Sequence, residues 1–257
     1  MIHSTAIIEK GAELDSGVEV GPYCIIGPKV KIGTGTRLMS HVVVSGKTSI
    51  GKSNTFFPFS VIGGVPQDLK YNGENTELRI GDRNTIRESV TLNLGTAQGS
   101  EVTVVGNDNL LMAYVHLGHD TSIGDHCIIA NSVQIAGHVT LEDYVTIGGV
   151  SAIAQFLKMG KHSYVSGHTG VEKSVPPFCI AHGSRPMTLR GANIVGLRRR
   201  GYKAEVIQML NETIKLWTRT DVNKDQTLIE IESQYGEAPE VQEFVRFIRD
   251  CDTGVVR

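Results

Sequence analysis

The sequence predicts a three-sided parallel β-helix followed by an α-helical C-terminal part. The first observation is a period of six, because nearly every sixth residue of the first 175 is apolar. The second is a column of mainly small side chains two positions before these apolar slots, so that both columns face inward. The third is that helical spacing replaces the period beyond residue 175. Such coils bury their slots only by stacking on one another.

The first run of the repeat has no polar residue in any slot. Its slots are Ile8, Leu14, Val20, Ile26, Ile32, Leu38, Val44, Ile50, Phe56 and Ile62. Glycine often follows a slot, as at Gly21, Gly27 and Gly33, and we expect these corner positions to take a positive φ. Eighteen residues complete one turn, and successive turns should rise by about 4.8 Å, the spacing of hydrogen-bonded strands. Residues eighteen apart therefore stack along one edge.

Two interruptions separate the runs of the repeat. Residues 66–77 (PQDLKYNGENTE) are polar and contain Pro66 and an Asn-Gly turn pair, which predicts an extended loop. Loops on a rigid scaffold commonly carry function. The register returns over Ile80, Ile86 and Leu92 and breaks again at residues 96–100 (TAQGS), where we expect a smaller turn. From Val105 to Val171 the period continues one residue out of phase.

The C-terminal part contains two apolar stripes at helical spacing. One comprises Val206, Ile207, Leu210, Ile214 and Trp217, and the other comprises Phe244, Val245, Phe247 and Ile248. The second stripe starts near Pro239, which suits a first helical turn. These helices should cap the last coil, whose backbone groups would otherwise stay unpaired. We therefore expect a β-helix over residues 1–186, with its loop at 66–77, and a helical domain over residues 187–257.

Composition narrows the classes of partner. The 25 basic and 27 acidic residues give a formal charge of -2, which provides no global attraction to nucleic acid or an anionic membrane. The four cysteines form no CxxC pair and are expected to be buried thiols in a reducing compartment. No basic stretch followed by an apolar run opens the sequence, and no segment approaches about 18 apolar residues. These features predict a cytoplasmic protein without a membrane span.

Residues 109–120 carry the side chains best suited to chemistry. Val115 and Leu117 fill the inward positions, so His116 and His119 should lie near or outside the wall. Asp120 can orient the imidazole of His119 and stabilise its protonated form. His138 follows about one turn later on nearly the same edge. Gly137 and Gln155 follow His119 at intervals of eighteen residues, so we expect these residues to line one groove.

Seven segments of the chain form a specific set of motifs. They are Gln67-Asp-Leu-Lys70-Tyr71, Ile80-Gly-Asp-Arg-Asn84, Ile86-Arg-Glu-Ser-Val-Thr91, Asp108-Asn-Leu-Leu-Met112, His116-x-x-His119-Asp120, Val175-Pro-Pro-Phe178 and Gly196-Leu-Arg-Arg-Arg-Gly201. Together they resemble the UDP-N-acetylglucosamine acyltransferases that begin lipid A synthesis, a family of hexapeptide-repeat enzymes. The resemblance covers nearly the whole chain. It implies a left-handed coil, a homotrimer with clefts between subunits, and no cofactor. It also implies transfer of a 3-hydroxyacyl group from acyl carrier protein to the 3-hydroxyl of the sugar.

The same resemblance implies catalytic roles for three residues. His119 would be the general base, because an alcohol must lose its proton as it attacks a thioester. Asp120 would hold the tautomer of that imidazole. The backbone N–H of Gly137 would stabilise the developing oxyanion. Stacking places Gly137 about 5 Å along the axis from His119, a distance that substrate would have to bridge.

Further residues are implied to bind substrate. Asp68 would contact the hydroxyl of the acyl chain, and Lys70 the nucleotide phosphate or the sugar. Arg199 and Arg200 would bind the uridine diphosphate, since arginines recognise phosphate in bidentate geometry, with Asn193 nearby. Gly167 would lie at the end of the acyl groove and influence chain length. The remaining substrate-binding positions are His116, His138 and Gln155.

Two departures from the family pattern leave other functions open. Ala154 replaces a histidine and Val195 replaces an acidic residue, so the acceptor could be a 3-amino sugar. The same departures also fit a non-catalytic paralogue that only binds nucleotide or carrier protein. A third alternative is a zinc enzyme of the γ-carbonic-anhydrase type, with His116, His119 and His138 as ligands, although no metal is expected.

Overall fold

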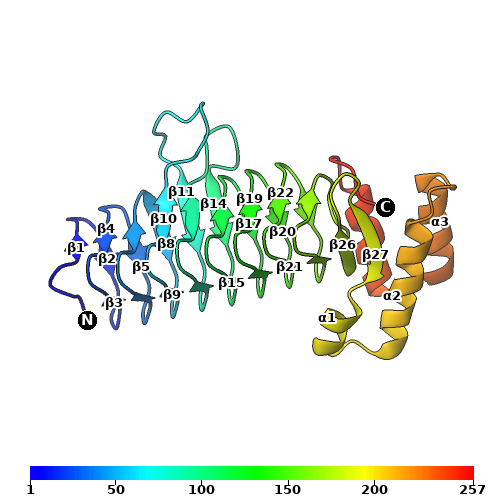
Figure 1. Ribbon diagram of the computed structural model, residues 1–257, viewed down its shortest axis with the longest axis horizontal. Coiled ribbons are helices and arrows are strands. Elements are labelled where there is room, and N and C mark those ends of the chain that lie inside the picture. Colours follow the sequence, from blue (N-terminus) through cyan, green and yellow to red (C-terminus); the bar gives the residue numbers. More distant parts are fainter.

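Each hexad of the sequence forms one side of a triangular coil. The computed structural model describes residues 1–257, and short strands recur every six residues along the repeat. Ile8 pairs in parallel with Ile26, and Ile26 pairs with Val44, so one turn contains eighteen residues where the repeat is unbroken. The coils stack into a prism, and helices close the end where the repeat stops (Figure 1). The predicted parallel β-helix with a helical C-terminal part is confirmed.

Three sheets form the faces of the prism. The first sheet contains β1 (Ile7–Ile8), β4 (Ile25–Ile26), β7 (Val43–Val44), β10 (Val61–Gly64), β13 (Thr91–Asn93), β16 (His116–Leu117), β19 (Gln134–Ile135), β22 (Ala152–Ile153) and β25 (Gly170–Val171). The second contains β2 (Glu13–Leu14), β5 (Lys31–Ile32), β8 (Lys47–Ile50), β11 (Glu77–Ile80), β14 (Val102–Val105), β17 (Ser122–Ile123), β20 (Thr140–Leu141) and β23 (Lys158–Met159). The third contains β3 (Glu19–Val20), β6 (Arg37–Leu38), β9 (Thr55–Phe56), β12 (Thr85–Ile86), β15 (Leu110–Leu111), β18 (Ile128–Ile129), β21 (Thr146–Ile147), β24 (Tyr164–Val165), β26 (Cys179–His182) and β27 (Thr188–Ala192).

The turns between these sheets form three corners. Corner 1 joins the first sheet to the second and includes Asp120, His138 and Phe156. Corner 2 joins the second sheet to the third and includes His126, Tyr144 and His162. Corner 3 joins the third sheet to the first and includes Tyr23, His41 and Phe59. Which corner a residue occupies decides which other residues it can reach.

The core consists of the predicted slots. Slots from Val20 onward are buried, while Ile8 and Leu14 at the open end of the prism are only partly covered. From Val18 onward the column two positions before the slots is also inside, and it includes two of the four buried cysteines, Cys24 and Cys127. No helix is both long and apolar enough to cross a bilayer.

Among the glycines that follow a slot, Gly63 has the predicted positive φ (73°), but the prediction was wrong for Gly21, Gly27 and Gly33. Space is the reason for glycine there: a Cβ on Gly21 would lie 2.6 Å from the carbonyl oxygen of Met39 in the next coil. Positive φ belongs instead to the third residue after a slot, such as Tyr23 with φ of 58°. The corners are therefore made by side-chain-bearing residues that can stack on one another.

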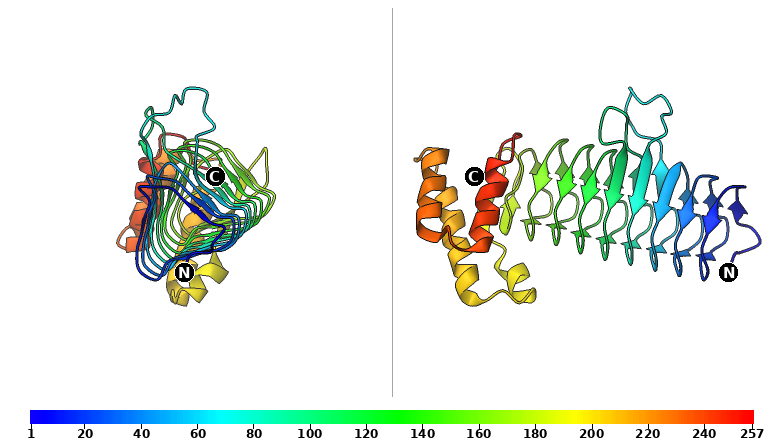
Figure 2. Two further views of the ribbon diagram at one scale, coloured as in Figure 1. Left: turned by 90° about the vertical axis from the view of Figure 1, so that its left-hand side faces the viewer. Right: turned by 180° about the vertical axis from the view of Figure 1, so that it is seen from behind.

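Both interruptions of the repeat are loops at corner 1. Residues 65–76 leave the prism between β10 and β11, and residues 94–101 leave it between β13 and β14. Figure 2 shows the first loop projecting at one corner of the triangle. The register survives both loops, because Ile62 pairs with Leu92 and Leu92 pairs with Leu117. The insertions therefore add chain without disturbing the stacking.

The C-terminal part begins with a hairpin and continues with four helices. β26 continues the prism in parallel with β24, and β27 pairs with β26 in antiparallel fashion. The helices are α1 (Ile194–Arg199), α2 (Ala204–Trp217), α3 (Lys224–Tyr235) and α4 (Pro239–Arg249). α2 and α4 match the two predicted stripes, whereas α1 and α3 were not predicted. α3 is largely polar and buries only Thr227, Leu228 and Ile231, so its apolar spacing is weak.

The domain boundary predicted between residues 186 and 187 falls in the turn of the β26–β27 hairpin. The final residues return to the prism, where Ser174 bridges Val255. Trp217 Nε1 donates to the carbonyl of Val256 at 2.8 Å, which fastens α2 to this returning segment. The helical part is thus tied to the last coils, and the division at residue 186 stays a prediction.

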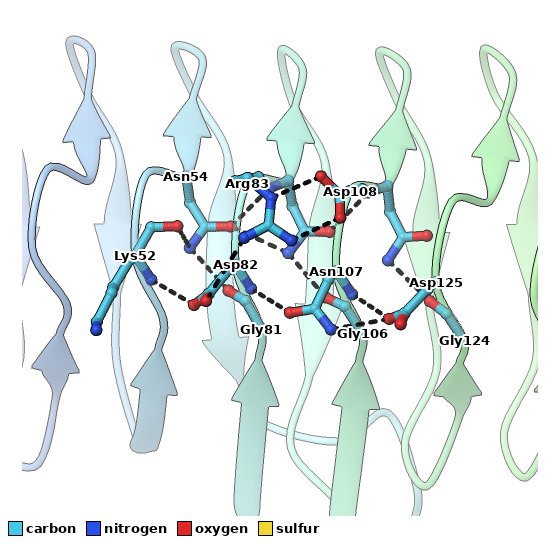
Figure 3. A network of polar contacts seen from close by, with 12 residues as sticks. Lys52, Asn54, Gly81, Asp82, Arg83, Gly106, Asn107, Asp108, Gly124 and Asp125 are labelled. Carbon is cyan, nitrogen blue, oxygen red and sulfur yellow. Dashed lines mark hydrogen bonds and ion pairs between the residues drawn. The ribbon is translucent and has the colours of Figure 1, made fainter.

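A ladder of polar side chains runs along corner 2 (Figure 3). The backbone N–H groups of Lys52, Asp82, Asn107 and Asp125 each donate to the side chain one coil further on, at 2.6 to 2.8 Å. Beside it, buried asparagines link the coils, since Asn54 Oδ1 accepts from the backbone N–H of Asn84 and Asn84 Oδ1 accepts from that of Asn109. These bonds satisfy turn N–H groups that the sheets leave unpaired.

Candidate active site

His119 and Asp120 lie in the corner 1 turn between β16 and β17. Asp120 has a φ of 58°, the left-handed conformation that a short polar residue tolerates. The hydroxyl oxygen of Thr103 accepts from the backbone N–H of Asp120 at 2.9 Å and helps to fix this turn. The side chain of Asp120 is completely buried, whereas His119 keeps 14% of its side chain exposed. The pair thus presents an accessible imidazole on a buried carboxylate.

The Asp120 carboxylate is surrounded by donors. Its Oδ2 accepts from the Thr96 hydroxyl at 2.6 Å, and it lies 2.8 Å from His119 Nδ1. The backbone N–H groups of Thr96 and Ser100 also point at it. Burial raises the pKa of Asp120, but the bonds from Thr96, His119 and Ser100 outweigh burial and leave that pKa below its ordinary value. The carboxylate is therefore charged.

The ring of His119 leans along the prism axis over Gly137. A Cβ on Gly137 would lie 2.6 to 3.1 Å from Cε1, Nε2 and Nδ1 of that ring, so only glycine leaves it room. We had expected a gap of about 5 Å, which holds for stacked backbones but ignores the direction of the side chain. His138 lies edge-on to His119, with ring centroids 5.0 Å apart, and stacks on Phe156.

His116 lies on β16, outside the wall as predicted, and next to the pair. Its Nδ1 is 2.8 Å from the hydroxyl of Thr91 on the neighbouring strand β13. Burial, with a smaller contribution from His119, lowers the pKa of His116. Its imidazole is therefore neutral near pH 7 and able to exchange hydrogen bonds with a substrate.

A cavity of about 420 Å³ lies against these residues. Its lining includes Gln67, Asn93, His116, His119, Gly137 and Gln155. The sequence reasoning singled out four of these and missed Gln67 and Asn93. Asn93 is 5% exposed, and its Oδ1 has no partner in the chain, so it offers a free acceptor. The signal for Asn93 was a polar residue directly after a slot, where the repeat usually has glycine.

The extended loop carries Asp68 and Lys70 at the same corner, but neither lines the cavity. Asp68 Oδ1 accepts from the backbone N–H of Lys70 at 2.9 Å, and Lys70 is exposed. Within one chain, therefore, these two predicted residues stand near the edge of the site and are not engaged with His119.

The predicted nucleotide-binding residues gather at corner 2. Asn193 caps α1 through Gly196 N–H and donates to the carbonyl of His162. Arg200, at the end of α1, places its guanidinium 4.5 Å from the centre of the Tyr144 ring. Tyr144 is itself stacked between His126 and His162, with ring planes within 10° of parallel. Arg199 is exposed on the same short helix.

A single chain does not bring all of the predicted residues together. His119 is at corner 1, Arg200 is beside corner 2, and Gly167 lies in a corner 3 turn between β24 and β25. Figure 2 shows the long loop and α1 on different corners of the triangle. Because the faces of a prism point in different directions, these groups meet only if neighbouring copies supply them.

The three histidines proposed as zinc ligands do not converge within a chain. His116 Nδ1 faces Thr91, whereas the compact group of possible ligands, within 4.8 Å of one another, is His119, Asp120 and His138. Asp120 in that group is already bonded to Thr96, Ser100 and His119. The geometry thus matches an oriented base better than the three-histidine site.

Known proteins share this arrangement. Residues 175–256 match the family model described as UDP N-acetylglucosamine O-acyltransferase, domain 2, and residues 103–137 match bacterial transferase hexapeptide (six repeats). LpxA from Acinetobacter baumannii is 45% identical, with a TM-score of 0.96 over 100% of this chain and 99% of that one. LpxA of Bacteroides fragilis, a UDP-N-acetylglucosamine acyltransferase, is 38% identical, with a TM-score of 0.96 over 100% of both chains. These likenesses confirm the left-handed β-helix.

Proposed function

The chain belongs to the UDP-N-acetylglucosamine O-acyltransferase family and is an acyltransferase, and from this premise we propose its reaction. It transfers a 3-hydroxyacyl chain from acyl carrier protein to the 3-position of UDP-N-acetylglucosamine, the first step of lipid A biosynthesis. The observation that carries the proposal is the His119–Asp120 pair, in which Nδ1 of the imidazole is anchored at the carboxylate and His119 lines the cavity.

His119 acts as the general base. Because Nδ1 faces the charged Asp120 carboxylate, Nδ1 carries the proton and Nε2 keeps its lone pair. Nε2 takes the proton of the sugar hydroxyl while the oxygen attacks the thioester carbonyl. It then returns a proton to the thiolate of the carrier protein as the C–S bond breaks. Asp120 stabilises the transient imidazolium.

Gly137 supplies the oxyanion donor. Its backbone N–H forms no hydrogen bond within the chain, and the Cα of Gly137 lies close to the His119 ring. A free, fixed N–H at the reacting centre stabilises the charge that develops on the carbonyl oxygen. In this proposal the base and the donor act on the same reacting centre.

The remaining residues bind substrate in this proposal. Asp68 contacts the hydroxyl of the acyl chain, and Lys70 the phosphate or sugar. Arg199, Arg200 and the α1 cap at Asn193 bind the diphosphate. Gly167 sets the end of the acyl groove. His116, His138 and Gln155 contact the sugar or the acyl group.

A homotrimer brings these parts together. The outer face of the first sheet is apolar near the open end, where Ile7, Ile25, Val43 and Val61 form one stacked column. Ile7 is 56% exposed in the single chain, which is unusual for a solvated sheet. A neighbouring copy packed on this face would bury the column and bring its own corners to His119. Analytical ultracentrifugation should give three times the chain mass of 27.9 kDa.

The acceptor could instead be a 3-amino sugar. The observation in its favour is that Ala154, beside Gln155 in the cavity lining, offers no side-chain hydrogen bond. A neutral amine is a better nucleophile than an alcohol and needs less help from a base. The two acceptors must therefore be compared directly.

The test is transfer from 3-hydroxyacyl carrier proteins of several lengths to each acceptor, read by mass spectrometry. We expect an acylated UDP-sugar, and the His119→Ala variant should lose about 10²–10⁴ in turnover while remaining folded. His3→Ala, an exposed imidazole at the open end, is the control and should change nothing. Full activity of His119→Ala would exclude the general base. Absence of any product with either acceptor would favour the non-catalytic alternative.

A further inference from the structure

The second interruption of the repeat is a compact loop wrapped around Asp120. Its residues 95–101 fold into a tight turn, in which the carbonyl of Thr96 accepts from the N–H groups of Gly99 and Glu101. Thr96 is 1% exposed. The loop is therefore ordered by its own bonds and does not merely span a gap between strands.

Two glycines let this loop approach so closely. A Cβ on Gly99 would lie 2.3 Å from Cγ of Asp120, and a Cβ on Gly95 would lie 2.3 Å from the backbone nitrogen of Val102. Neither glycine has a positive φ, so the requirement is for space and not for an unusual backbone conformation. The fit is thus specific to the carboxylate of Asp120.

The hydroxyl of Thr96 makes the key contact. It donates to Asp120 Oδ2 at 2.6 Å, and the same oxygen is 2.8 Å from His119 Nδ1. Thr96 and His119 therefore share one carboxylate oxygen. The hydroxyl of Ser100 lies near both Oδ1 of Asp120 and the carbonyl of Val102, so its single hydrogen is divided between two acceptors.

We propose that residues 95–101 form a positioning clamp of the active site, in which Thr96 and Ser100 hold the Asp120 carboxylate charged and oriented and thereby fix the tautomer of His119. The inference rests on the proposed role of His119 as base. Thr96 is a positioning residue, because it acts only through Asp120. Without the clamp, the fully buried carboxylate would lose the bonds from Thr96 and Ser100 and keep the one from His119.

The first test uses a matched pair of substitutions. Thr96→Val removes the hydroxyl but keeps the branched shape, and we expect kcat to fall about 10- to 100-fold, the effect of one hydrogen bond to a charged group. Thr96→Ser keeps the hydroxyl and should stay within about threefold of the parent. KM for the nucleotide sugar should not change in either. Thr36→Val, which removes a buried hydroxyl bonded to Gly51 at the far end, controls for a general loss of stability.

The second test asks whether Thr96 acts through Asp120. In an Asp120→Asn background, Thr96→Val should cause no further loss, because the charge that it stabilises is gone. Multiplicative losses in the double variant would overturn the proposal, as would a Thr96→Val variant within twofold of the parent. If Thr96→Val does not fold, Ser100→Ala replaces it, with an expected loss of about threefold.

A third readout does not depend on turnover. The ¹⁵N spectrum of histidine-labelled protein, with His119 assigned through His119→Ala, reports the tautomer of its ring. We expect the Nδ1–H form in the parent and a mixture in Thr96→Val. An unchanged tautomer would refute the clamp even if the enzyme acts on another substrate. Failure of the proposed function would instead appear as absent product with an intact tautomer response.

Discussion

Corners 1 and 2 of the prism have the same backbone turn but treat its N–H groups in opposite ways. At corner 2 the second residue after a slot donates its N–H to a side chain one coil further on in four successive coils, as Asn107 does to Asp125 (Figure 3). At corner 1 the equivalent N–H groups of His119, Gly137 and Gln155 form no hydrogen bond within the chain. Side chains therefore occupy these donors along the ladder of corner 2, whereas three of them stay open beside the candidate site at corner 1.

The imidazoles at the two corners differ in the same sense. His162 at corner 2 is buried between aromatic rings, and its pKa is lowered to about 4, mainly by burial and further by Lys161 and Arg200. His119 at corner 1 lies beside a charged carboxylate and remains accessible. Rings stack at both corners, but the imidazole of His162 is buried in its stack whereas that of His119 stays accessible.

The largest effect should come from filling the space under His119. Gly137→Ala places a methyl group against the imidazole without backbone strain, since Gly137 has no positive φ. We expect turnover to fall by about 10²–10⁴, as for loss of the base, with thermal stability nearly unchanged. Gly27→Ala at the same corner is the control, because its Cβ would meet only ordinary contacts at 3.4 Å. A fully active Gly137→Ala would contradict the geometry of the base.

The next prediction concerns a substitution that gives corner 1 the kind of side-chain acceptor found at corner 2. Gln155 stands eighteen residues after Gly137, as Asp143 stands after Asp125, so Gln155→Asp should offer its carboxylate to the Gly137 N–H. If the Gly137 N–H is the oxyanion donor that we propose, its loss should reduce kcat by about 10²–10³. Gln155→Ala provides no acceptor and should retain more activity. Equal losses in the two variants, measured by steady-state kinetics, would argue against the free N–H.

The third prediction concerns the stability of corner 2. The folded pKa of His162 lies below its unfolded value of about 6.5, so the unfolded chain binds the extra proton between pH 6.5 and 4. The contribution of His162 to the free energy of unfolding should therefore be fully present above pH 6.5. The free energy of unfolding should fall by roughly 3 kcal/mol as the pH drops to 4. Urea titrations at fixed protein concentration measure it. His162→Phe keeps the stacked rings and should reduce the dependence of the free energy of unfolding on pH. An unchanged pH dependence in this variant would show that other groups cause it.

The smallest expected effect is on the binding of the nucleotide sugar, after a substitution of Tyr144. Tyr144→Leu removes the ring beneath the Arg200 guanidinium, a cation–π contact of about 1 kcal/mol. KM for the nucleotide sugar should rise about fivefold at constant kcat. Tyr144→Phe keeps the ring and is the control. A fall in kcat with constant KM would place corner 2 in the chemistry and weaken the contrast between the corners.

The sequence predicted most of the architecture. A period of six with apolar slots can bury those slots only in stacked coils, and the buried residues from Val20 to Val171 agree. It also identified α2 and α4 from their stripes, and the pairing of His119 with Asp120 from adjacency. It missed α1, α3 and the β26–β27 hairpin, whose apolar spacing is short or weak.

The structure decided what the two loops do and which residues share a corner. The loops lengthen the interval between stacked residues, so Ile62 pairs with Leu92 and Leu92 with Leu117, and equal spacing no longer identifies neighbours. The contacts of Thr96 with Asp120 and of Arg200 with Tyr144 therefore have no signature in the repeat.

By itself the sequence determined the prism, its period and its candidate base, because burial of regularly spaced apolar side chains is a local and repetitive requirement. Only the tertiary structure decided that Thr96 bonds to Asp120 and that His119 covers Gly137. It also decided that backbone N–H groups of corner 2 bond to side chains of the next coil. Those outcomes depend on side-chain direction and on loop length across distant segments. Neither property can be read from a periodic pattern.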